Sequence, residues 1–204
     1  MLIRDLSVCL SVTHSWKRLL ESSHKLWTIL DTTSVKKTIS QKSLTIHFRR
    51  SKWTLDRAIL TMKAIDAQRL AYITKNCKML KELQMHGRGM IADSLASALK
   101  DAKSLENLYV SRNTETTLSA VQSALGHCKN SLVTATFLNI RGPRGGFLAA
   151  RWPVMGPIKT IHLEADGESC LDIVSGIPGS FNVLQKLTDV SSTVFGTLLP
   201  LLLP

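Results

Sequence analysis

The chain has 204 residues, of which 44% are hydrophobic and 5% aromatic, and its formal net charge is +11. This length excludes a peptide too small to form a core, and it allows one elongated domain or two small ones. The charge is uneven, because residues 1–100 hold 18 Lys and Arg against 7 Asp and Glu, whereas residues 101–204 hold 8 against 8. A basic half can attract nucleic acid or an acidic protein surface, and scattered solvated lysines are the plainer alternative.

Residues 1–31 are predicted to form short amphipathic helices. Apolar residues recur there at helical spacing, first over 6–10 and again over 12–20. A segment this short scarcely forms a core of its own, so we expect it to pack on the following residues or on a partner chain. Arg4 and Asp5 interrupt the first apolar run, so no secretory signal is predicted.

A pattern with a period of about 26 residues follows. Six-residue units keep apolar or small residues at their first, fourth and sixth places, and they begin at Leu55, Leu80, Leu105, Leu132 and Ile158. The last four places of each unit alternate, as in a strand with one buried face. One strand and one helix of this length cannot bury their own apolar face, so the copies are expected to stack into a curved solenoid.

Helices are expected between these strands. The predicted helices and their candidate N-caps are 67–76 after Asp66, 94–100 after Asp93, and a run from Leu118 to Leu125 after Thr114 and Thr117.

The segment 141–146 breaks the pattern, because Arg-Gly-Pro-Arg-Gly-Gly favours turns and leaves room only for a short helix over 147–151. Its glycines and arginines also suggest an anion-binding loop. The spacing fits neither of the common phosphate-binding motifs, so a bulged loop between repeats is the favoured interpretation.

The four cysteines lie far apart and form no C-x-x-C pair, so neither a zinc site, a redox motif nor a disulfide framework is predicted. Cys77, Ala102 and Cys128 each precede the first leucine of a unit by three or four places. The pattern predicts a small buried side chain at this place. We therefore predict that Cys77 and Cys128 are core residues and that the compartment is reducing, either cytosol or nucleus.

Residues 174–204 depart from the repeat. One more strand is expected near residue 184, yet Asp189 falls at a place that should be apolar, and glycines and a proline at 176–179 interrupt the expected helix. A degenerate repeat with an irregular tail is therefore predicted. The closing Leu-Pro run is too short to span a bilayer, so no membrane partner is expected.

No motif in the sequence points to catalysis. The six histidines lack the spacing of metal-ligand motifs, and no serine occupies a G-x-S-x-G elbow. We therefore expect the chain not to be an enzyme, and we predict no cofactor, metal site or catalytic residue.

The repeat predicts a binding surface instead. Side chains alternate along a strand, so where Leu83 and Met85 face inward their neighbours face outward. Stacked strands place the outward residues side by side on the concave face, where solenoids usually bind. The candidate contact residues are Glu82, Gln84, His86, Asn107, Tyr109, Ser111, Thr134, Thr136, Thr160, His162 and Glu164. Tyr109 and His86 lead this set, because exposed aromatic residues supply much interface energy, and an ordinary solvated residue is the alternative at each place.

Three short motifs, Arg4-Asp5-Leu6, Ser15-Trp16-Lys17-Arg18-Leu19 and Leu26-Trp27, resemble the second half of an F-box. The Leu-Pro-x-Glu helix with which an F-box normally starts has no counterpart ahead of them. The L-x-x-L-x-L units follow these motifs directly. This layout is similar to that of F-box/leucine-rich-repeat (LRR) proteins, and more weakly to that of fungal F-box proteins that also carry TPR repeats.

The resemblance implies an α/β fold, namely a leucine-rich-repeat solenoid of about five strand-helix repeats preceded by a small helical partial F-box. It divides the chain into a partial F-box over 1–31, leucine-rich repeats over 32–173 and an irregular or degenerate tail over 174–204.

In that family the F-box binds the Skp1 adaptor of a cullin-RING ubiquitin ligase, and the repeats hold the substrate. The resemblance therefore implies a substrate-recognition subunit of an SCF (Skp1-cullin-F-box) E3 ubiquitin ligase, nuclear or cytoplasmic, with an unidentified protein substrate on the concave face. The residues that it assigns to Skp1 binding are Leu6, Cys9, Leu10, Val12, Trp16 and Leu20.

A second hypothesis is a non-catalytic LRR interaction scaffold without a ligase link, associated with chromatin through its basic half. In this case Trp16 would be buried as a cap of the solenoid, and Arg49, Arg50 and Lys52 would be presented instead. Direct nucleic-acid binding is compatible with the charge but is not the favoured expectation.

Overall fold

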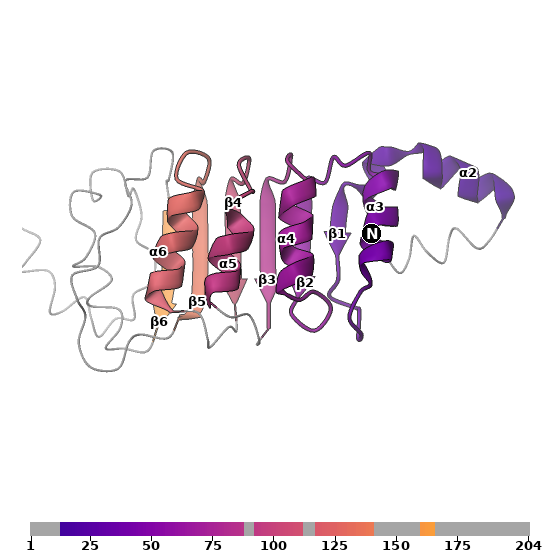
Figure 1. Cartoon of the computed structure of the whole chain (residues 1–204). Helices are drawn as coiled ribbons and strands as arrows, with labels where there is room; N and C mark the ends of the chain where they lie inside the picture. Colours follow the sequence, from indigo (N-terminus) through magenta and orange to yellow (C-terminus); the bar gives the residue numbers. More distant parts are fainter. Residues whose placement is uncertain (1–12, 88–91, 112–116, 141–159, 166–204) are drawn as a thin grey trace, which may run out of the picture.

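A computed structural model describes residues 13–87, 92–111, 117–140 and 160–165 (Figure 1). The helices are α2 (His14–Ser22), the short 3-10 helix η1 (His24–Trp27), α3 (Gln41–Arg50), α4 (Ala67–Asn76), α5 (Ala92–Leu99) and α6 (Leu118–His127). The strands are β1 (Ile29–Asp31), β2 (Arg57–Thr61), β3 (Glu82–His86), β4 (Asn107–Ser111), β5 (Thr134–Ile140) and β6 (Thr160–Ala165).

Within these residues the strands form one parallel sheet in the order β1-β2-β3-β4-β5-β6, which is also their order in the sequence. Helices α3, α4, α5 and α6 follow one another along one face of the sheet, and α2 extends beyond its β1 end (Figure 1). The α/β prediction is confirmed, and the alternation of strands and helices is compatible with a repeat solenoid.

The strands stack nearly in register. Leu83 of β3 pairs with Ala58 of β2 and with Leu108 of β4. The same pairing register continues along these three strands, so equivalent residues lie side by side. Just before each strand, a single backbone carbonyl accepts hydrogen bonds from two successive N–H groups of the next repeat. The accepting residues are Thr28, Asp56, Lys81 and Glu106, and the N···O distances are between 2.7 and 3.2 Å. Each repeat therefore satisfies the backbone of its neighbour at the same point.

The core lies between the sheet and its helices. The first leucine of each described unit is buried, as are the inward residues of the strands, such as Leu60, Met85 and Phe137. The helices contribute apolar residues at a spacing of three or four, for example Leu95 and Leu99 in α5. Burying one such side chain contributes roughly 1.5–3 kcal/mol, so the repeated leucines contribute strongly to the stability of the fold.

Sequence analysis predicted N-cap residues for three helices; those of α4 and α6 agree with the structure and that of α5 does not. Asp66 caps α4 by accepting a hydrogen bond from Arg69 N, and Thr117 caps α6 by accepting one from Ala120 N. The prediction for α5 was wrong, because this helix begins at Ala92 and Asp93 lies inside it.

The prediction for Cys77 and Cys128 is confirmed. Both are free and buried, and Ser51 and Ala102 occupy the corresponding buried place in their repeats. Burial raises the pKa of Cys77 to about 12 and that of Cys128 to about 11, so both thiols are protonated at neutral pH.

The β1 end of the sheet holds a cluster of rings that sequence analysis did not predict. Strand β1 lies within 1–31, so the sheet begins before residue 32, where the repeats were expected to start. The Phe48 ring on α3 is surrounded by the rings of His47, Trp53 and Tyr72. Their centroids lie 5.6 to 6.2 Å from the centroid of the Phe48 ring. Trp27 of η1 meets His47 at 5.6 Å, and the Arg50 guanidinium lies 4.7 Å from the Trp27 ring. These rings connect η1 to the first repeat.

Several predictions fall outside the described residues, namely those for 141–146, 147–151 and 174–204. No helix of the described part is long and apolar enough to cross a membrane.

Shortening a core leucine is expected to destabilise the fold strongly. Leu83→Ala should lower the free energy of unfolding by about 2–5 kcal/mol, because Leu83 is fully buried between two neighbouring strands. Urea denaturation followed by circular dichroism measures the change. Met79→Ala is the control, because Met79 is 55% exposed and its loss should change stability by less than about 0.5 kcal/mol. Equal effects of the two substitutions would contradict the assigned core.

Acid is expected to destabilise the fold through His47. Burial is the main cause that lowers the pKa of His47 from 6.5 to about 4; a backbone hydrogen bond with Trp27 opposes this shift and the positive charge of Arg50 adds to it. Between these values the unfolded chain binds a proton that the folded chain does not, so stability is complete above pH 6.5 and is lost as pH falls towards 4. The loss attributable to this group reaches about 3 kcal/mol.

Thermal unfolding at pH 7.5 and pH 4.5, compared between the parent and His47→Phe, measures this effect. The parent should lose more stability than the variant over this interval. The same loss in both proteins would show that His47 is not responsible.

Candidate functional site

On the face of the sheet opposite the helices, the strand positions fall into three rows. Alternation along each strand and stacking in register place equivalent residues side by side. The first row is Arg57, Glu82, Asn107, Thr134 and Thr160. The second is Ile59, Gln84, Tyr109, Thr136 and His162, and the third includes Thr61, His86 and Ser111. We call this surface the open face.

Polar contacts link neighbouring side chains of the first row and join this row to the second. Arg57 Nε lies 3.1 Å from Glu82 Oε1, and Gln84 Nε2 donates to the same carboxylate oxygen at 2.6 Å. Further along, Thr134 Oγ1 donates to Asn107 Oδ1 at 2.5 Å. These contacts hold the polar groups of adjacent strands in fixed positions, so a partner meets an ordered surface.

The leading candidates, His86 and Tyr109, are in contact with each other. Their ring centroids lie 5.3 Å apart, and His86 Nδ1 lies 2.9 Å from Ser111 Oγ. Both rings remain partly exposed. The expected exposure of Ser111 was wrong, because its side chain is only 6% exposed and lies against the His86 ring. Ser111 therefore positions His86 and offers little surface to a partner.

A groove of ≈ 350 Å³ crosses the middle of the open face. It is lined by Glu82, Leu83, Gln84, Asn107, Leu108, Tyr109, Thr134 and Thr136. Glu82 is the single residue of this lining that is charged at neutral pH. Of the predicted contact residues, six therefore share one groove. For Thr160, His162 and Glu164 the structure gives the place on β6 but does not describe the side chains.

The groove offers hydrogen-bonding groups and one aromatic ring. In the described part of the chain no group of three or more His, Cys, Asp or Glu could hold a metal ion. The arrangement suits recognition of an extended segment, because its donors and acceptors come from three adjacent strands.

Of the residues assigned to Skp1, the two that fall on a described element lie on α2, which extends beyond the β1 end of the sheet (Figure 1). Leu6, Cys9, Leu10 and Val12 fall outside the described residues, and Trp16 lies on α2 without a described side chain. Leu20 is 5% exposed and faces inward, where its carbonyl accepts a hydrogen bond from Trp27 Nε1 at 2.9 Å. Among the side chains that the structure describes on α2, η1 and β1, the exposed large apolar ones are Leu19, Leu26 and Ile29.

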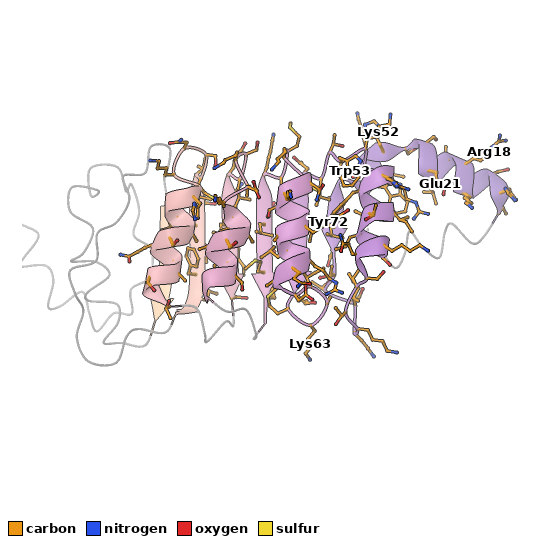
Figure 2. The ribbon with its side chains drawn as sticks, viewed as in Figure 1. Arg18, Glu21, Lys52, Trp53, Lys63 and Tyr72 are labelled. Carbon is orange, nitrogen blue, oxygen red and sulfur yellow. The ribbon has the colours of Figure 1, made fainter. Side chains whose placement is uncertain are left out.

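The basic residues of the second hypothesis divide into two kinds. Arg50 is engaged, because it lies over Trp27 and forms an ion pair with Glu21 of α2 at 3.4 Å. Arg49 and Lys52 are exposed. Figure 2 places Glu21 and Arg18 on α2 and Lys52 at the end of α3.

No protein-family model matches the sequence, and no curated protein matches it.

Replacing Tyr109 by alanine is expected to leave the fold intact. The ring is partly exposed and its described neighbour is His86, so the loss of stability should stay below about 1 kcal/mol. Chemical denaturation of the variant beside Leu83→Ala would measure the difference. A loss as large as that of the core variant would mean that Tyr109 supports the fold and is unsuitable as a probe of binding.

Proposed function

We propose that the chain is a leucine-rich-repeat protein that binds a protein partner on its open face, as the substrate-recognition subunit of an SCF ubiquitin ligase. The observation that supports the binding face best is the groove across β3, β4 and β5. Its polar groups are held by contacts within the first row and between the first and second rows, and Tyr109 presents an apolar ring with a hydroxyl group. Tyrosines in such positions often contribute a large part of the binding energy.

The ligase link rests on the F-box-like motifs and gains support from the exposed surface around α2. Leu19 is 58% exposed, Leu26 and Ile29 follow on adjacent elements, and Lys17, Arg18 and Lys25 are exposed nearby in sequence. Apolar residues with basic neighbours suit a partner surface that is apolar and acidic. We therefore assign Skp1 binding to α2 and η1 and substrate binding to the open face.

Two single substitutions should separate these functions. Leu19→Asp places a charge on the proposed Skp1 surface and should reduce co-purification of Skp1 at least about tenfold, because a desolvated charge opposes apolar docking. Met79→Asp is the matched control, because Met79 has nearly the same exposure and lies in the loop between α4 and β3. Affinity purification of the full chain with quantitative mass spectrometry measures both.

Tyr109→Ala should retain Skp1 and lose the proteins that the parent co-purifies beside the ligase subunits. The ligase assignment fails if Skp1 is absent from the parent, or if Leu19→Asp and Met79→Asp retain it equally. Loss of the same additional proteins in Met79→Asp would argue against the open face as the substrate site.

A further inference from the structure

One position outside the groove carries a lysine ahead of each of the strands β2, β3, β4 and β5. It follows directly after the small buried residue that precedes each unit. The four pairs are Ser51-Lys52, Cys77-Lys78, Ala102-Lys103 and Cys128-Lys129. The first member of each pair is buried, and all four lysines are exposed. The lysines recur at intervals of 26, 25 and 26 residues, which is the period of the repeat itself.

A second row of cations lies three residues earlier in the first three repeats. It consists of Arg49, Lys75 and Lys100, all exposed at or just after the last turn of a helix. The segments 49–56, 75–81, 100–106 and 126–133 together hold nine Lys and Arg against three Asp and Glu. Much of the net positive charge of the chain is therefore concentrated in four loops.

These four loops lie along one edge of the sheet. Each connects the end of a helix to the start of a strand, and the strands are parallel, so all four reach the same edge, the upper one in Figure 1. Contacts between loops agree with this arrangement, because Lys78 Nζ lies 3.5 Å from Asp101 Oδ1 of the next loop. Figure 2 shows Lys52 at this edge and Lys63 at the opposite one. We call the upper edge the lysine edge.

An exposed tryptophan stands at one end of the lysine edge. Trp53 is 37% exposed and follows Lys52, and both residues have positive φ, 53° for Lys52 and 62° for Trp53. Two successive non-glycine residues in this region of φ are unfavourable, so the surrounding contacts must hold them there. Trp53 N donates to Phe48 O at 2.7 Å, and its ring lies 5.6 Å from Phe48. The loop therefore keeps an aromatic ring partly exposed beside the first lysine.

We propose that the lysine edge binds single-stranded nucleic acid, with phosphates along the row of lysines and an unstacked base on Trp53. Regularly spaced ammonium groups suit a regularly charged backbone and do not read sequence. Stacking of a base on an exposed ring is typical of proteins that bind single strands. The bases of a duplex are paired and stacked, so none is free to stack on Trp53. An acidic peptide supplies negative charge, but it does not carry a planar base on each of its units. This site is separate from the open face and does not depend on the proposed ligase function.

Fluorescence anisotropy with labelled oligonucleotides tests this site in the full chain. The probes are oligo-dT and oligo-rU of about 15 nucleotides, a DNA duplex of equal length and a polyglutamate peptide. Single strands should bind most tightly, and their affinity should fall steeply with salt. Changing Lys52, Lys78, Lys103 and Lys129 together to Gln should weaken binding more than about tenfold and reduce the salt slope by about 3, because each lost phosphate contact removes about 0.7.

The matched control changes four lysines away from the lysine edge to Gln, namely Lys36, Lys37, Lys42 and Lys63, all of which are exposed. It has the same net charge as the first variant and should bind within about threefold of the parent. Trp53→Leu should weaken binding about tenfold, whereas Trp53→Phe should retain most of it. Circular dichroism confirms that each variant is folded.

Three outcomes would overturn the proposal. Equal losses in the two lysine variants would show attraction by net charge alone. Polyglutamate binding as tight as that of oligo-dT, with no effect of Trp53→Leu, would assign the edge to an acidic protein segment. Equal binding of the duplex, again without an effect of Trp53→Leu, would exclude recognition of an unstacked base.

Discussion

The fold depends on the contacts between neighbouring repeats, in which each repeat supplies hydrogen-bond partners and covers the apolar face of the next. A short parallel strand has no hairpin partner, so its N–H and C=O groups and its buried face need a copy on each side. The carbonyls of Thr28, Asp56, Lys81 and Glu106 meet this need at the same point of each repeat. Register, the rows of the open face and the alignment of the loops all follow from this stacking.

Sequence analysis identified the elements whose apolar spacing is strong. The units at Leu55, Leu80, Leu105 and Leu132 could be aligned because each begins with a leucine that is buried in the core. Strand β1 was missed, because three residues are too few to show alternation. Helix α3 was missed as well, because polar residues dominate its sequence and its burial depends on three inward side chains.

In the candidate site, too, some features could be predicted from the sequence and others could not. Alternation predicted which residues share the open face, because it follows directly from strand geometry. It did not predict that Ser111 is buried, since that depends on how the His86 ring lies against it. The row of lysines was present in the sequence, but its members lie in loops, where no hydrophobic period marks them. Only the parallel order of the strands brings them to one edge.

The parallel order also aligns α3, α4, α5 and α6, so their carboxyl ends all point to the lysine edge. Each helix end carries a partial negative charge from its peptide dipoles, and parallel dipoles side by side repel one another. The cations that follow Ser51, Cys77 and Cys128, which are the C-caps of α3, α4 and α6, offset this repulsion. A polyanion that binds at the lysine edge must therefore compete with the negative carboxyl ends of the helices for the same ammonium groups.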